Sequence, residues 1–314
     1  MATLDPITQN FVTSVAKEKP LYEQSYVDAR QQLETLQKHE ASLDIKEFKI
    51  EVPFDGRRVP AVIFRPHLAK HDMPVIFYTH GGGWILGSPS VHGSLMEDLT
   101  RRTGAAVVFP QFTPAPEKQY PTQFEESYAV LKYIVDQGAR FQLIAERIAL
   151  AGDSAGGHMA IALIQLATLR RLPVKPCHLM LFYPVTDTSN KSSTYEEFHD
   201  GPYLSEKVLD WMLEAFLPNP QDRCNALTSP LSFASDKELS IFPPTTVFVA
   251  GADPLIKEGE AFGNRLQNVG VETAILKADG LIHDYMMLEA VRQSPTAKAV
   301  LELATSQLKR ALGN

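Results

Sequence analysis

The chain has 314 residues but only two cysteines, Cys177 and Cys224. Such sparse use of cysteine is typical of proteins from reducing compartments, although a disulfide between the two stays open. The first residues lack the basic segment and the apolar core of a secretory signal. No apolar run approaches the roughly 20 residues that a membrane-spanning helix needs. We therefore expect a cytoplasmic protein without a membrane span.

Clusters of positive charge are also absent. The formal net charge is −7, and no run of lysine or arginine occurs. Proteins that bind nucleic acids need such clusters because the phosphates must be neutralised. We expect no nucleic-acid partner.

Groups of residues with the spacing of metal ligands are also scarce. His67 and His71 lie four residues apart beside Asp72, a spacing that metal ligands use, but Pro66 and Pro74 bracket them. Neither a His-Glu-x-x-His motif nor a cysteine pair accompanies them. These residues fit a solvated loop better, so we expect no metal and no cofactor.

Hydrophobic residues make up 44% of the chain, enough for a large core. Apolar segments of strand length alternate with amphipathic segments of helix length, which predicts an α/β fold with a mostly parallel central sheet flanked by helices. Asp55-Gly56 indicates a hairpin between the first two strands. The expected strands are residues 46–54, 58–65, 74–79, 105–110, 147–151, 177–183, 245–250 and 272–277, and the expected helices are residues 7–17, 22–40, 91–102, 124–138, 255–269 and 296–312.

The alternation stops once, between Thr186 and Pro244. Two aromatic-rich helical stretches are expected there, over residues 195–199 and 205–217, with several prolines around them. We interpret this segment as an insertion after a strand end, where the loops of open α/β sheets surround a ligand site.

The most informative motif is Gly152-Asp153-Ser154-Ala155-Gly156, which follows apolar strand residues and precedes a helical sequence. Gly-x-Ser-x-Gly in this setting predicts a nucleophile elbow, a sharp turn that lifts the serine hydroxyl clear of the sheet. The glycines are needed because a Cβ on either side would collide with the neighbouring strand or helix. A glycine-rich turn without a catalytic role is the alternative.

A serine nucleophile needs a base, and the base needs an orienting carboxylate; in this type of fold the chain order is Ser, Asp or Glu, then His. Of the four histidines that follow Ser154, three are considered as the base. His158 lies on the following helix, where packing is the expected role, and His199 lies in the insertion. His283 follows the last expected strand in a glycine-marked loop, so we predict that it is the base.

Asp253 comes just after the strand expected at residues 245–250 and is the predicted orienting acid. Its alternative role is to cap the next helix. Glu258 and Asp284 are the other candidates for the acid.

The segment His80-Gly81-Gly82-Gly83-Trp84 directly follows another expected strand. Consecutive glycines let backbone N–H groups turn toward a ligand oxygen, so Gly82, Gly83 and Ala155 are predicted to form an oxyanion hole. His80 is predicted to order this loop. A phosphate-binding loop is disfavoured because Leu86 stands where the dinucleotide fingerprint requires glycine.

Together these motifs resemble the hormone-sensitive-lipase-like branch (family IV, with HGGG and GDSAGG motifs) of the α/β-hydrolases, over most of the chain from about residue 45 onward. The resemblance implies an α/β-hydrolase fold with a helical cap and a triad of Ser154, Asp253 and His283. It places N-terminal helices of the cap at residues 1–45, the cap insertion at 187–230, and the catalytic domain at 46–186 and 231–314.

Two departures from the family pattern stand out. Residues 111–117 read Gln-Phe-Thr-Pro-Ala-Pro-Glu where the family often carries Asp-Tyr-Arg-Leu-Ala-Pro-Glu, and Lys257 occupies a position that is usually acidic. The first departure affects the support of the oxyanion loop. Variants with a similar Thr-Pro-x-Pro-Glu segment look like microbial hydrolases of acetyl and other short-chain esters.

We therefore expect a carboxylesterase that acts on short- to medium-chain esters, acetyl esters included, through an acyl-enzyme. An acyltransferase or amidase with the same triad is an alternative. A binding receptor on the same fold is another, but such receptors lack the family's catalytic histidine, so the presence of His283 favours an enzyme. The expected partner is a small-molecule ester. The resemblance also suggests a homodimer through the strand at residues 272–277.

Several aromatic residues are candidates for the walls of a substrate pocket. The alternative for each of them is ordinary packing within the cap. The candidates are Trp84, Tyr183, Tyr203 and Trp211.

Overall fold

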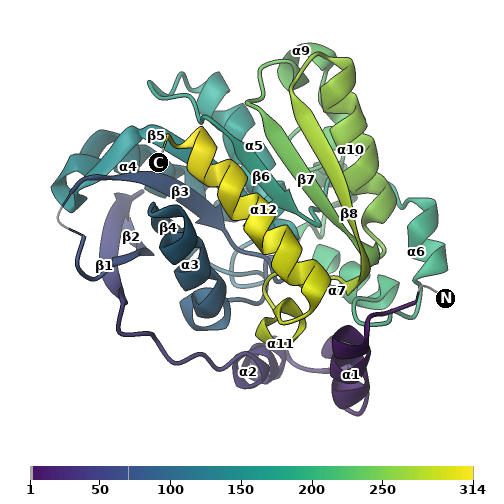
Figure 1. Cartoon of the computed structure of the whole chain (residues 1–314). Coiled ribbons are helices and arrows are strands. Elements are labelled where there is room, and N and C mark those ends of the chain that lie inside the picture. The colour runs from purple at the N-terminus through teal and green to yellow at the C-terminus, as the bar shows by residue number, and fades with distance from the viewer. Residues whose placement is uncertain (1–2, 70, 314) are drawn as a thin grey trace.

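In the computed structural model, which describes residues 3–69 and 71–313, eight strands form one sheet in the order β1-β2-β4-β3-β5-β6-β7-β8 (Figure 1). Pairings β1–β2 and β2–β4 are antiparallel and all others are parallel, so the predicted mostly parallel sheet is confirmed. Residues 1, 2, 70 and 314, which the predicted domain ranges include, lie outside the described residues. The strands are β1 (Ile45–Phe54), β2 (Arg57–Pro66), β3 (Met73–Thr79), β4 (Ala106–Pro110), β5 (Leu143–Asp153), β6 (Leu179–Phe182), β7 (Thr245–Ala252) and β8 (Thr273–Ile282).

Helices cover both faces of this sheet. On one face α3 (Pro89–Thr103) and α12 (Pro295–Ala311) pack side by side, and α4 (Thr122–Gln137) and α5 (Ala155–Leu169) pack on the other (Figure 1). Every residue of β3, β4, β6 and β7 is buried as a result, which explains why these strands read as continuous apolar runs. The helix α10 (Ile256–Asn268) packs against β7 and β8.

The hairpin predicted at Asp55-Gly56 is present. Phe54 pairs with Arg57, and the two residues between them both have positive φ, 46° and 70°. This is the backbone of a two-residue turn whose twist matches that of the strands.

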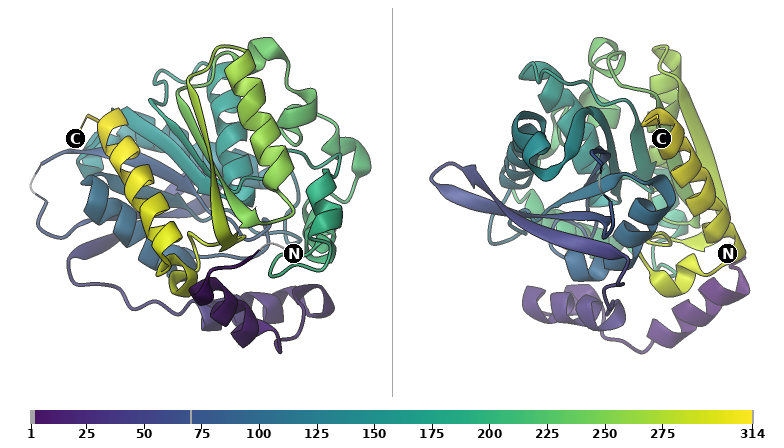
Figure 2. Two further views of the ribbon diagram at one scale, coloured as in Figure 1. Left: turned by 45° about the vertical axis from the view of Figure 1, so that its right-hand side comes forward. Right: turned by 60° about the vertical axis from the view of Figure 1, so that its left-hand side comes forward.

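A group of helices from two distant parts of the chain lies beyond the ends of the parallel strands. In both views of Figure 2 the N-terminal helices lie together at the bottom, near the helices that follow β6. Tyr26 stacks on Trp211 with 4.9 Å between ring centroids, and Phe11 contacts Tyr203 at 5.8 Å. The elements are α1 (Pro6–Val15), η1 (Leu21–Glu23), α2 (Tyr26–Leu36), α6 (Ser193–Glu197) and α7 (Glu206–Phe216). Their grouping as a cap, with the boundaries given above, stays a prediction.

Some boundaries differ from those expected. The helix expected over residues 22–40 is shorter, because Ser25 caps α2 by accepting the N–H of Asp28. It ends at Leu36, where the Gln37 side chain turns to donate to the Met287 carbonyl at 2.7 Å. The last strand is longer than expected. Gly280, which the sequence places in the loop after the strand, lies within β8 with φ 81°.

The remaining elements are short. They lie between the longer helices and strands described above. They are η2 (Gly138–Phe141), η3 (Pro220–Arg223), α8 (Pro230–Phe233), α9 (Asp236–Leu239) and α11 (Glu289–Arg292). In the described part of the chain no helix has the length and apolar character needed to cross a bilayer. The strand β8 is at one edge of the sheet, where the predicted dimer contact would form; dimerisation itself stays a prediction.

Leu266 of α10 is fully buried, whereas Leu303 of α12 is 38% exposed. We expect Leu266→Ala to lower the free energy of unfolding by about 2–5 kcal/mol, because the lost burial and the cavity both cost stability. Denaturant unfolding followed by circular dichroism measures the change. The matched substitution Leu303→Ala should cost less than about 1 kcal/mol, and an equal loss in both variants would contradict the predicted packing of α10.

Candidate active site

Ser154 is at the turn between β5 and α5 with φ 53° and ψ −124°, a combination that is strained for any residue other than glycine. Hydrogen bonds to the neighbouring strand hold it there. Its N–H donates to the Phe182 carbonyl of β6 at 2.9 Å, and its carbonyl accepts the N–H of Val185 at 3.2 Å. The predicted sharp strand–turn–helix setting of the serine is therefore confirmed.

The two glycines flanking Ser154 allow the close approach that the turn needs. A Cβ on Gly152 would lie 2.7 Å from the Thr79 carbonyl oxygen and would overlap the Gly156 carbonyl in α5. A Cβ on Gly156 would overlap the same Thr79 oxygen of β3. The predicted collisions with the neighbouring strand and helix are both present.

The structure brings the three predicted triad residues into one hydrogen-bonded chain. The His283 Nε2 atom lies 2.8 Å from the Ser154 Oγ, and its Nδ1 atom lies 2.6 Å from the Asp253 Oδ2. All three side chains are buried. They directly follow β5, β7 and β8. These strands run parallel in one sheet, so their carboxyl ends lie on the same side of it.

The charges around His283 stabilise the imidazolium that forms when its ring accepts a proton. Burial by itself lowers the pKa of this imidazole, but the negative charges of Asp253 and then of Asp284 outweigh it and raise the pKa above its usual value. The second oxygen of Asp253 accepts the N–H of Leu255 at 2.9 Å, so this carboxylate also holds the turn before α10. The alternative role of capping the next helix is not seen, because the N-cap of α10 is Leu255 and, among the described residues, no side chain caps this helix.

The other two acids considered for this role do not contact His283 Nδ1. Glu258 accepts the N–H of Thr186 at 2.7 Å and the hydroxyl of Tyr195 at 3.1 Å, and burial raises its pKa to about 8. Asp284 is close to His283, but its Oδ1 lies 3.5 Å from Nε2, the atom that faces Ser154. Among the three acids, Asp253 is the one hydrogen-bonded to Nδ1.

The glycine loop after β3 forms a tight turn next to Asp153, the residue before Ser154. Gly82 and Gly83 have φ 95° and 61°, and the N–H of Leu86 donates to the Gly82 carbonyl at 2.8 Å. Ala155 begins α5, so its N–H is among the first in the helix, which have no acceptor within it. The three predicted donors thus belong to two segments, which are joined by the hydrogen bond from the Gly81 N–H to Asp153.

Two buried side chains, those of His80 and Asp153, hold this loop in place. The His80 ring stacks between Phe109 and Phe112, with ring centroids 4.9 Å and 4.4 Å away, and its Nδ1–H donates to the Gly81 carbonyl at 2.9 Å. Burial, and next the nearby His92, lower the pKa of His80 to about 3, so it is neutral. Asp153 accepts the N–H of Gly81 at 2.9 Å and so supports the glycine loop. In the sequence, the one indication of this supporting role is that Asp153 belongs to the Gly-x-Ser-x-Gly motif.

A supporting residue that the sequence did not reveal is Arg30 of α2. Its guanidinium donates to the Ile85 carbonyl at 2.8 Å and to the Ala115 carbonyl at 2.9 Å, and it pairs with both oxygens of Glu117. The N–H of Ala115 in turn donates to the Trp84 carbonyl. An arginine from the N-terminal segment therefore ties the glycine loop to residues 111–117, where the family's usual arginine is replaced by threonine.

The four aromatic residues predicted to line the pocket each contact a different part of the structure. Trp84 is buried and stacks on Phe216 at 4.3 Å, and His158 packs against its edge at 5.4 Å. The Tyr183 hydroxyl accepts the N–H groups of Met286 and Met287, just after His283. The half-buried Tyr203 and Trp211 contact the N-terminal helices as described above. Their roles as pocket walls stay predictions.

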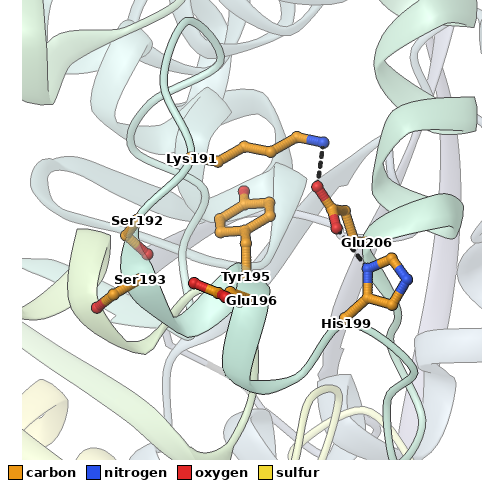
Figure 3. A pocket seen from close by; sticks show the side chains of 7 residues that line it. All are labelled: Lys191, Ser192, Ser193, Tyr195, Glu196, His199 and Glu206. Atoms are coloured by element: carbon orange, nitrogen blue, oxygen red, sulfur yellow. Dashed lines mark hydrogen bonds and ion pairs between the residues drawn. The ribbon is translucent and has the colours of Figure 1, made fainter.

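A hollow of about 350 Å³ is lined by residues of α6, the first residue of α7 and the loops beside them, and not by Ser154, Asp253 or His283. Figure 3 shows that its charged groups face one another: Lys191 contacts Glu206 at 2.5 Å, and His199 contacts the other oxygen of Glu206 at 2.6 Å. Lys191 and Glu206 therefore neutralise each other's charge. The hollow is lined by Lys191, Ser192, Ser193, Tyr195, Glu196, His199 and Glu206.

His67, His71 and Asp72 are exposed. Within residues 3–69 and 71–313 no group of three or more histidine, cysteine or acidic side chains is arranged to hold a metal. Cys177 and Cys224 are free thiols.

The fold and this arrangement of residues define an α/β-hydrolase. Residues 76–287 match the family model described as the alpha/beta hydrolase fold, and the chain belongs to that family.

Comparison with individual proteins narrows the class. The chain is 45% identical over 312 residues to an esterase from Gibberella moniliformis, covering 99% of this chain and 98% of that protein. It is 30% identical over 245 residues to an ethyl acetate hydrolase from Pseudomonas putida, covering 76% and 74%. The crystal structure of a thermostable esterase from Pseudomonas putida superposes with a TM-score of 0.94 at 32% identity, covering 99% and 98%. The protein is a carboxylesterase of the hormone-sensitive-lipase-like branch.

The close contact at Gly156 leads to a stability prediction. A Cβ there would lie 2.6 Å from the His80 carbonyl oxygen, and backbone cannot move aside as a flexible side chain can. We expect Gly156→Ala to lower the free energy of unfolding by about 1–3 kcal/mol, measured by denaturant unfolding. Gly138, with φ −55° and no atom closer than 3.4 Å to an added Cβ, supplies the control. Gly138→Ala should change stability by less than about 1 kcal/mol, and similar losses in both variants would contradict the steric explanation.

Proposed function

We propose that the protein hydrolyses carboxylic esters with Ser154 as nucleophile, His283 as general base and Asp253 as the orienting acid. The observation that carries this proposal is the continuous chain from the Asp253 Oδ2 through His283 to the Ser154 Oγ, with links of 2.6 Å and 2.8 Å. These lengths are within the reach that proton transfer requires.

Each proton in the reaction then has a place. Ser154 Oγ bonds to the carbonyl carbon while its proton moves to His283 Nε2, and the negative charge of Asp253 stabilises the resulting imidazolium. The same Nε2–H protonates the alcohol oxygen as the ester bond breaks. A water molecule, deprotonated by His283, then attacks the acyl-enzyme and releases the carboxylic acid and Ser154.

The N–H groups of Gly82, Gly83 and Ala155 are proposed to stabilise the charge that develops on the carbonyl oxygen. Loss of one such donor typically lowers the rate by about 100- to 1000-fold. The supports of the loop, Asp153 below it and Arg30 behind it, favour a fixed position for these donors before substrate binds. Fixed donors cost no reorganisation when the charge forms.

We propose that residues 1–45 and 187–230 form a cap over this site and that the acyl groups accepted are short. Met212 of α7 supports this: it is buried, and a Cβ added to Gly83 would overlap its sulfur atom, so a cap side chain lies directly against the oxyanion loop. The similarity to an ethyl acetate hydrolase also favours acetyl esters.

Ser154→Ala is expected to reduce kcat/KM for p-nitrophenyl acetate by at least about 10⁴-fold, because no other hydroxyl replaces the nucleophile. Release of p-nitrophenol measures the rate. Ser240→Ala, which alters an exposed serine, should keep the wild-type rate. Equal turnover by wild type and Ser154→Ala would overturn the nucleophile assignment.

Asp253→Asn is expected to lower kcat by about 10⁴-fold, because an amide stabilises neither the required tautomer nor the imidazolium. The same assay measures the change. Asp279→Asn removes an equal charge from an exposed residue of β8 and should have little effect. A loss of less than tenfold in Asp253→Asn would exclude Asp253 as the acid.

A series of p-nitrophenyl esters from two to ten acyl carbons tests the acyl preference. We expect kcat/KM to be highest at six carbons or fewer, and Met212→Ala to move the optimum to longer chains because it removes the side chain that lies against Gly83. Leu213→Ala, at the next position of α7, controls for general loss of packing. A wild-type optimum at ten carbons, or an unchanged optimum in Met212→Ala, would contradict this view of the cap.

A further inference from the structure

Asp284 places a carboxylate on the reacting side of His283. It follows the histidine directly and has φ 65°, in the left-handed region, so the chain turns back at this point. Its Oδ1 lies 3.5 Å from His283 Nε2, the atom that is 2.8 Å from Ser154 Oγ. Asp253 contacts the opposite nitrogen, so the two carboxylates lie on opposite edges of one imidazole ring.

The carboxylate of Asp284 differs from the other buried acids in its hydrogen bonding. Asp153, Asp187 and Glu258 each accept at least two hydrogen bonds. The Oδ1 atom of Asp284 is buried, yet it has no hydrogen-bond donor among the described residues. A buried acceptor without a donor is costly, and such exceptions occur where a ligand supplies the partner.

The proposed reaction determines which part of the substrate comes near this oxygen. To be protonated, the oxygen of the leaving alcohol must lie within hydrogen-bond reach of His283 Nε2. Because Asp284 Oδ1 is 3.5 Å from the same nitrogen, the first carbons of the alcohol must pass close to the carboxylate. The acyl group, held by the nucleophile and the oxyanion donors, points elsewhere.

On this basis we propose that Asp284 is a specificity-determining residue that favours esters of alcohols carrying a positive charge, or a hydrogen-bond donor near the ester oxygen, and disfavours anionic alcohols. The inference rests on the proposed triad. Charges interact strongly in a site from which water is largely excluded, and the Asp284 side chain is only 12% exposed. Burial raises the pKa of Asp284 to about 6, with the His283 charge acting in the opposite direction, so the carboxylate is ionised at pH 8.

Three acetate esters of one shape test the charge preference at pH 8. They share the acetoxyethyl group and differ in its terminal group: trimethylammonium in acetylcholine, tert-butyl in 3,3-dimethylbutyl acetate, and sulfonate in 2-acetoxyethanesulfonate. Release of acetate gives kcat/KM for each. We expect the wild type to prefer the cation to the anion by about 100-fold or more, with the neutral ester between them.

Asp284→Asn keeps the shape of the side chain and tolerates the left-handed backbone, and Asp284→Gly removes the side chain at a position where glycine is unstrained. Each should reduce the cation-to-anion ratio by about tenfold or more while still hydrolysing the neutral ester. The two variants guard against misfolding of either one. Asp279→Asn is the matched control, because it removes the same charge from a residue that is 79% exposed. Its ratio should equal that of the wild type.

The outcomes separate the two proposals. If the wild type does not hydrolyse 3,3-dimethylbutyl acetate, or Ser154→Ala hydrolyses it equally well, the proposed mechanism fails. If the wild type hydrolyses it through Ser154 but Asp284→Asn and Asp284→Gly keep the wild-type cation-to-anion ratio, the role of Asp284 is overturned. A ratio that falls equally in Asp279→Asn would assign the preference to net charge and would also overturn it.

Discussion

Hydrogen bonds from β6 and the turn after it hold the backbone of Ser154 at φ 53°, and the positions of the other groups in the site follow from this geometry. A residue in this region is strained, so the surroundings must supply the stabilisation. They do so through close backbone contacts that only Gly152 and Gly156 permit. The serine hydroxyl then points away from the sheet, toward the loops that carry His283 and the glycine turn.

The N-terminal segment connects those loops. Arg30 donates to the carbonyl of Ile85 in the glycine loop, and Gln37 donates to the carbonyl of Met287 after the histidine. The N–H of Asp5 bonds the Gly280 carbonyl at the end of β8. One segment therefore contacts the loops of both the oxyanion donors and the base, in addition to packing on α7. We infer that it fixes the distance between these loops.

Much of the fold and of the candidate site could be predicted from short patterns in the sequence. The glycines around Ser154 and after His80 need conformations or contacts that other residues cannot provide, so they mark their own turns. The order of Ser154, Asp253 and His283 matched the strand ends that the sheet brings together. Element boundaries were less predictable: Gly280 suggested a strand end, yet the pairing of β7 with β8 carries the strand past it. The shortened α2 likewise depends on a contact between Gln37 and a residue 250 positions away.

By itself, the sequence determined the α/β-hydrolase class, the nucleophile motif and the candidate members of the triad, because each depends on local backbone requirements or on the order of strand ends. Only the tertiary structure shows which of Asp253, Glu258 and Asp284 is hydrogen-bonded to His283 Nδ1, since all three follow β7 or β8 and differ in which atom they approach. It also revealed Arg30 behind the glycine loop and, beside His283, the buried Asp284 oxygen that accepts no hydrogen bond from the described residues. Contacts of this kind depend on the three-dimensional meeting of distant segments, for which no local pattern in the chain gives a signal.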